Sequence, residues 1–66
     1  MAIVKVIEVI ASSDKGIEAA IENAVQEVSK TIHNIDSVYL KDTKVHVKDG
    51  KIVYWGVICK VSFRVD

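Results

Sequence analysis

The sequence contains no proline, only three glycines and a single cysteine, Cys59, in 66 residues. One cysteine cannot form a disulfide within the chain, and no group of cysteines and histidines has the spacing of a structural zinc site. Domains shorter than about 70 residues usually need disulfides, metals, oligomerisation or unusually good packing to be stable. Because disulfides and zinc are excluded, the sequence favours oligomerisation.

The chain also has no net charge, since nine basic residues balance nine acidic ones. No run of lysine or arginine provides the positive field of a nucleic-acid-binding surface. The apolar segment 2–11 is interrupted by Lys5 and Glu8, is too short to cross a membrane and lacks the layout of a signal peptide. We therefore expect a cytoplasmic protein with neither a nucleic-acid partner nor a membrane partner.

What the sequence does contain is apolar residues, which make up 50% of the chain. Residues 3–11 are rich in β-branched side chains and predict a strand. The following turn offers Ser13 or Asp14 as a helix N-cap. The spacing of the next apolar residues predicts a helix over about 14–33, with His33 in its last turn. These apolar positions are Ile17, Ala20, Ile21, Ala24, Val25, Val28 and Ile32.

Two further strands are predicted over 37–48 and 51–65, joined by a hairpin turn at Asp49–Gly50. As one extended strand, 51–65 would span about 50 Å, longer than the roughly 30 Å diameter of a compact chain of this size. We therefore expect this hairpin to curl, with Gly56 as the place of a bend or of a close backbone approach.

The two faces of the strand 51–65 differ in composition. Its odd-numbered residues are all apolar and predict the face that packs under the helix, which includes Trp55 and an inert, buried Cys59. Its even-numbered residues are apolar in the first half and polar in the second, as expected of a face that contacts another subunit or a ligand. One helix cannot cover both faces of three strands, so we expect neighbouring chains to close the other face.

The predicted fold class is therefore α+β. It consists of a β-α-β-β unit whose three-stranded antiparallel sheet is partly wrapped around one long helix, in a single domain of residues 1–66. No Ser-His-Asp order, phosphate-binding loop or paired carboxylates stand out in the chain, so we expect a protein that is not an enzyme.

The order and spacing of three segments give the chain a family resemblance. These are KVIEVIASSDKGIEAAIENAVQEVSKTIHNI at 5–35, DGKIV at 49–53 and KVSFRVD at 60–66. Together with the total length, they make the sequence resemble a dodecin. The resemblance implies a hollow homododecamer of 23 symmetry that stores or sequesters flavin, of the riboflavin or FMN type, without catalysis.

The resemblance also implies where flavin would bind and why binding would be weak. In flavin-binding dodecins a tryptophan after the helix–strand loop stacks on the ring and a glutamine in the last strand bonds to its polar edge. Here these positions match Ser37 and Gly56, with Tyr39 and Ile58 nearby, so these four residues are the predicted cofactor site. A lost stack of about 1–3 kcal/mol and a lost hydrogen bond of about 0.5–1.5 kcal/mol would together weaken binding tens-fold or more, and by two or more orders of magnitude when both losses are large.

Two alternatives stay open at this stage. Tyr39 can either stack on the ligand or serve as an ordinary interface tyrosine, and the assembly can have lost flavin and hold ions or another metabolite instead. For an ion, His46 and Asp42 share a strand face, but at about 13 Å apart they cannot bind one metal within a chain. Copies of either side chain around a symmetry axis could converge on an ion, whereas the simpler interpretation is a solvated strand face.

Overall fold

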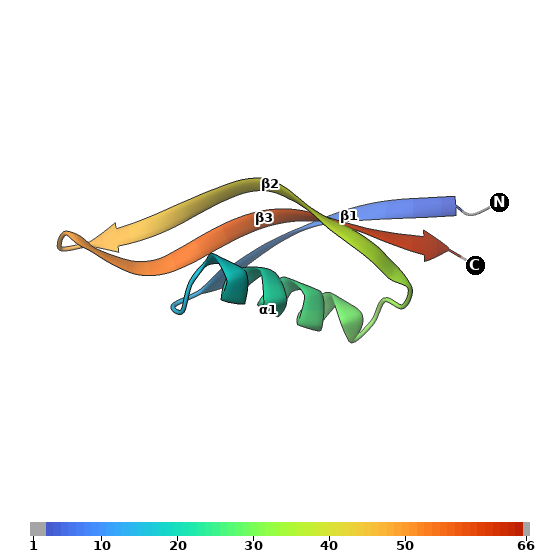
Figure 1. Cartoon of the computed structure of the whole chain (residues 1–66), viewed down its shortest axis with the longest axis horizontal. Coiled ribbons are helices and arrows are strands. Elements are labelled where there is room, and N and C mark those ends of the chain that lie inside the picture. Colours follow the sequence, from blue (N-terminus) through green and yellow to red (C-terminus); the bar gives the residue numbers. More distant parts are fainter. Residues whose placement is uncertain (1–2, 66) are drawn as a thin grey trace.

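The computed structural model describes residues 3–65, which form one helix and three strands: β1 (Ile3–Ser13), α1 (Ile17–Ser29), β2 (Ile35–Lys48) and β3 (Lys51–Val65). The strands form one antiparallel sheet in the order β1-β3-β2, so the C-terminal strand is central. The helix lies against one face of this sheet (Figure 1). The predicted β-α-β-β fold is confirmed, although the predicted domain also includes residues 1, 2 and 66, which lie outside the described part.

The helix is shorter than predicted, and its predicted start is wrong. It begins after Gly16, whose φ of 140° lies in a region that favours glycine, and no side chain caps it. The hydroxyl Oγ of Ser13 instead accepts a hydrogen bond from the backbone N–H of Lys15 at 3.0 Å. Neither Ser13 nor Asp14 is therefore the N-cap, because a glycine turn places both before the helix.

The helix also ends earlier than the predicted residue 33. The backbone N–H groups of Thr31 and Ile32 both donate to the carbonyl of Val28, which tightens the last turn. Asn34 then adopts a positive φ of 62°, a conformation that asparagine tolerates, and the chain turns into β2. His33 consequently lies in the connecting loop and not in the last helical turn.

The hairpin between β2 and β3 is confirmed at the predicted residues. Asp49 and Gly50 have φ values of 53° and 75°, and positive φ at both positions is typical of the two-residue turns that join twisted strands. The described chain is elongated, with extents of 51 × 20 × 13 Å. The long strand β3 therefore fits because the subunit itself is not compact.

The curl of the hairpin comes from irregular pairing between β2 and β3. The register shifts at three places, between the positions Ile35/Ser37, Leu40/Asp42 and His46/Val47 of β2. Such bulges bend a strand and increase its twist. None of the shifts lies at Gly56, which has no positive φ. A close backbone approach is not found there either, since the nearest backbone atom, the Ala11 carbonyl oxygen, would be 3.9 Å from a Cβ built on Gly56.

The core lies between α1 and the middle of β3. Its six buried residues are Ala20, Ala24, Val28, Val57, Cys59 and Val61. The two alanines let the helix approach the sheet closely, and complete burial of Cys59 confirms that it is a core residue. Burial also raises the pKa of the Cys59 thiol.

Only the middle of β3 is buried under the helix. Val53 and Val65 share the odd numbering of the core residues, but they are 41% and 39% exposed. A helix of 13 residues is only about 20 Å long, so it cannot cover a sheet more than twice that length. No helix in the described part of the chain is long and apolar enough to cross a membrane.

Candidate functional site

The four predicted site residues lie on the sheet face that points away from α1, here called the outer face. Residues paired across antiparallel strands share a face, and successive residues alternate between faces. Ser37 pairs with Ser62, and Tyr39 pairs with Lys60. Ile58 and Gly56 pair with Asp42 and Lys44, while the odd-numbered residues between them are buried under the helix.

The outer face separates the predicted site residues into two groups. Ser62, the partner of Ser37, is six residues from Gly56 along β3, a distance of roughly 20 Å. Tyr39, by contrast, lies opposite Lys60, and Ile58 is the next residue of β3 on the same face as Lys60. The chain thus brings Tyr39 close to Ile58 but keeps Ser37 and Gly56 too far apart to touch one ring.

At the first of these places, the Ser37 side chain is occupied by its cross-strand neighbour. The two hydroxyls of Ser37 and Ser62 are hydrogen-bonded at 2.7 Å, and Ser62 Oγ also donates to the Ser37 carbonyl at 3.3 Å. Tyr39, two residues further along β2, is 73% exposed. The aromatic surface at this end of the outer face therefore comes from Tyr39 and not from the matched position itself.

At the second place, the stem of Lys44 covers Gly56, which is buried. A Cβ atom built on Gly56 would lie 3.4 Å from Cγ and 3.5 Å from Cε of Lys44. A larger side chain could be accommodated if the flexible lysine moved. Sequence reasoning missed Lys44 because only the strand register shows that it faces Gly56.

A second lysine of β2 connects the two edge strands over the outer face. Lys41 Nζ lies 3.3 Å from Oε2 of Glu8, so the ion pair crosses from β2 to β1 over the central strand. Lys41 is the residue that the register shift between Leu40 and Asp42 leaves unpaired in the ladder. Sequence analysis missed this pair because it depends on the bulge.

The predicted metal residues are not assembled into a site within one chain. Among residues 3–65 no group of three or more histidine, cysteine, aspartate or glutamate side chains could hold a metal ion. His46 instead stacks on Tyr54, with ring centroids 4.0 Å apart and planes inclined by 18°. An ion shared by Asp42 or His46 side chains of several copies stays a prediction.

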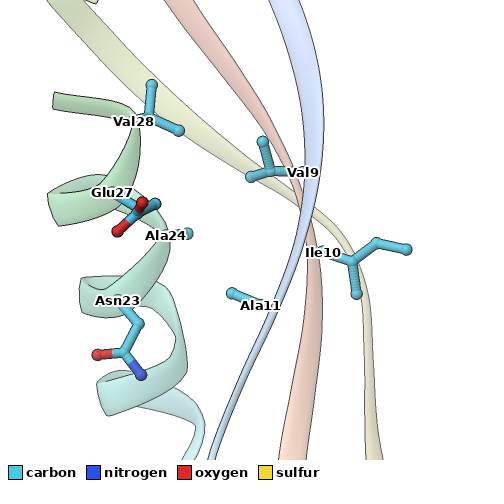
Figure 2. A pocket seen from close by; sticks show the side chains of 7 residues that line it. All are labelled: Val9, Ile10, Ala11, Asn23, Ala24, Glu27 and Val28. Carbon is cyan, nitrogen blue, oxygen red and sulfur yellow. The ribbon is translucent and has the colours of Figure 1, made fainter. Parts of the chain in front are cut away.

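A separate groove of about 380 Å³ lies between α1 and the edge strand β1. Its lining residues are Val9, Ile10, Ala11, Asn23, Ala24, Glu27 and Val28. Val9 and Ala11 point toward the helix, whereas the side chain of Ile10 points away from it (Figure 2). Asn23 closes one end, because its Nδ2 donates to the Ser12 carbonyl at 3.1 Å. The groove is apolar inside, and Glu27 adds a carboxylate.

Comparison with known proteins agrees with this architecture. The family model described as Dodecin matches residues 3–66. The chain belongs to the dodecin family. A curated dodecin from Thermus thermophilus is 27% identical over 62 residues, covering 94% of this chain and 90% of that protein. The family and the fold support a dodecin-like small-ligand-binding protein.

Solved dodecin structures reproduce nearly the whole described fold. The dodecin from Streptomyces davaonensis is 32% identical with a TM-score of 0.92, covering 98% of this chain and 96% of that chain. A calcium dodecin from Mycobacterium tuberculosis, described as having a novel calcium-binding site, is 28% identical with a TM-score of 0.83. The match to this second protein covers 97% of this chain and 91% of that chain.

Proposed function

We propose that this dodecin forms a non-catalytic homododecamer that binds and sequesters a flavin of the riboflavin or FMN type, or a related planar ligand. We further propose that it binds flavin more weakly than dodecins with a stacking tryptophan. One observation carries this proposal: a serine whose hydroxyl is bonded to Ser62 stands where the flavin-stacking tryptophan is expected. The fold needed for assembly is kept, while the side chain best suited to a flavin ring is absent.

The separation of the site residues supports a ligand site shared between copies. Ser37 and Gly56 are roughly 20 Å apart along the sheet, so one flavin can contact both positions only if they come from different chains. The exposed ring of Tyr39 is the aromatic surface available beside Ser37 and Ile58. We therefore assign Tyr39 and Ile58 to the ligand-contacting surface of one copy. Ser37 and Gly56 lie at the two ends of this surface.

The chemistry of the two matched positions supports weak binding. Serine offers no ring for stacking, which is worth about 1–3 kcal/mol per ring. Glycine offers no amide to the ring edge, and a neutral hydrogen bond contributes about 0.5–1.5 kcal/mol. Their joint loss, about 1.5–4.5 kcal/mol, corresponds to a decrease in affinity of roughly a hundredfold at the middle of that range, which a stack on Tyr39 would offset in part.

Restoring both groups tests this proposal. Riboflavin and FMN are titrated into the wild type, Ser37→Trp, Gly56→Gln and the double variant, with quenching of flavin fluorescence as the signal. We expect the double variant to bind about a hundredfold more tightly than the wild type, and more tightly than either single variant. Asp36→Trp adds the same ring one residue earlier in β2 and should give no such gain.

Assembly is measured first for each variant, because glutamine at position 56 must displace Lys44. Wild-type binding at nanomolar concentration would contradict the weak-binding proposal and would indicate that Tyr39 replaces the missing ring. A double variant that assembles normally and ignores both flavins would show that the ligand site lies elsewhere.

An ion-holding or metabolite-holding assembly that has lost flavin is the second candidate. The specific observation in its favour is the similarity to the calcium dodecin of Mycobacterium tuberculosis. Asp42 and His46 are the side chains we propose for such an ion, supplied by several copies around an axis. Calorimetric titration with Ca²⁺ of the wild type and of Asp42→Asn separates the candidates. Calcium binding that is lost in the variant, without any flavin response, would favour the second candidate.

A further inference from the structure

The end of the β2–β3 hairpin, residues 45–54, extends beyond the rest of the molecule. The last pair between β1 and β3 joins Ser13 to Trp55, so beyond this pair only two strands remain. In Figure 1 this end of the hairpin reaches past both α1 and β1. Its aliphatic residues Val45, Val47, Ile52 and Val53 are between 41% and 61% exposed. A two-stranded ribbon with an uncovered apolar surface is marginally stable alone, so this segment needs a partner.

The tip of this hairpin carries a local excess of positive charge. Lys48 lies directly opposite Lys51, and like charges in that arrangement destabilise a strand pair. Lys44 adds a third positive charge within 44–51, against the single negative charge of Asp49. A carboxylate supplied by the partner would relieve the repulsion between Lys48 and Lys51.

The groove between α1 and β1 has the opposite character. The helix Ile17–Ser29 contains three glutamates and no lysine or arginine. One of them, Glu27, lines the groove, whose inner surface is formed by apolar side chains that include Val9, Ala11 and Val28 (Figure 2). Glu27 pairs with Lys30 at 2.9 Å, but both side chains are largely exposed, and a carboxylate can accept several hydrogen bonds.

We propose that the hairpin end of one copy lies in the α1–β1 groove of a second copy. The hairpin face that carries Val45, Val47 and Ile52 would cover the apolar interior of the groove. Lys51, which lies beside the turn on the opposite face of the hairpin, would reach the exposed carboxylate of Glu27. The occupant is another copy of this chain because the same chain carries both surfaces, with matching apolar character and opposite charge. The inference rests on the proposed homododecamer and extends it by naming the two surfaces. A contact between different surfaces of identical chains can repeat around an axis and close.

Charge reversal tests the contact without damaging the subunit. Lys51→Glu places opposite charges across the hairpin, so the isolated hairpin should become no less stable. If the proposal is right, Lys51→Glu and Glu27→Lys each raise the concentration at which the assembly dissociates by roughly tenfold or more. The combined variant, with both charges exchanged, should recover most of the loss.

The matched control is Glu18→Lys, because Glu18 and Glu27 are nine residues apart and so lie on opposite sides of the helix. This variant should dissociate at the wild-type concentration. Unchanged assembly in both Lys51→Glu and Glu27→Lys would overturn the proposal and would leave the groove to a ligand or an unrelated protein. Equal losses in all three variants would also overturn it, since they would reflect net charge alone.

A crosslink reads the contact directly. Oxidation of the variant Glu27→Cys/Lys51→Cys should give covalent multimers on a non-reducing gel, whereas Glu18→Cys/Lys51→Cys should stay monomeric. The reverse pattern would contradict the proposed docking. Because this readout needs neither flavin nor twelve copies, it distinguishes a failure of the docking from a failure of the proposed function.

Discussion

The two faces of β3 have the same backbone but opposite environments. On the inner face, Val57, Cys59 and Val61 are at most 1% exposed, because α1 covers them. On the outer face, Tyr54 is 38% exposed and Lys60 is also exposed to solvent, although Ile58 between them is apolar. The inner face is completed within one chain, whereas α1 does not cover the outer face, which is where we propose that neighbouring copies or a ligand bind. Folding and assembly should therefore respond to different substitutions.

The largest effect should come from a charge on the inner face. Val61→Asp places an unpaired carboxylate in a fully buried position, which destabilises a domain by about 4 kcal/mol or more. For so small a chain this exceeds what the fold can tolerate, so the circular dichroism spectrum should be that of an unfolded chain. A well-folded variant would show that the inner face is not the core.

A charge on the outer face should act on assembly instead. Ile58→Glu adds a carboxylate to a half-buried position on the outer face, which a single subunit can hydrate but an interface cannot. We expect soluble species smaller than the dodecamer, or aggregates, with secondary structure largely retained in the soluble fraction. An intact dodecamer in light scattering would mean that the outer face is not buried between copies.

The buried thiol gives a smaller, pH-dependent effect. Because burial raises the pKa of Cys59, the folded state holds its proton to higher pH than the unfolded state does. This contribution to stability is fully present below the ordinary thiol pKa of 9.0 and is lost as pH rises toward the folded value. The loss is about 1.4 kcal/mol for each pH unit between the two pKa values.

Urea unfolding between pH 7 and pH 10 measures how the free energy of unfolding changes with pH, with Cys59→Ala as the control. The variant should be less stable at pH 7, but its free energy of unfolding should fall less as the pH rises, because it lacks the thiol. Identical slopes in both proteins would show that the thiol ionises as easily in the folded state as in the unfolded chain.

The smallest effect should come from the ion pair on the outer face. Lys41 and Glu8 are both about half exposed, and such pairs contribute about 0–1 kcal/mol. Lys41→Ala should therefore change the free energy of unfolding of the subunit by less than about 1 kcal/mol. A larger loss, measured by urea unfolding, would indicate that the pair also holds neighbouring copies together.

Much of this architecture could be predicted because it follows from periodic patterns. The apolar spacing around Ala20 and Ala24 gave the helix, alternation gave the long strand, and Asp49–Gly50 gave the hairpin. The ends of the helix could not be predicted, since Gly16 begins it without a side-chain cap and the chain leaves it before His33. Such ends depend on local backbone turns more than on hydrophobic period.

The candidate site was harder to predict than the fold because it depends on register. The sequence placed Ser37 and Tyr39 on one face, and pairing with Ser62 and Lys60 agrees with that. Three register shifts could not be read from the sequence, so the packing of Lys44 on Gly56 was missed. The resemblance supplied the site positions, and only the sheet revealed how far apart they lie.

The native mass of the purified protein tests the central claim most directly, namely that copies of this chain close the outer face and the hairpin end. Light scattering or native mass spectrometry at micromolar concentration should give about 88 kDa, twelve times the 7.3 kDa of one chain. A stable monomer or dimer at that concentration would contradict the account, because both apolar surfaces would then be exposed to water without a partner.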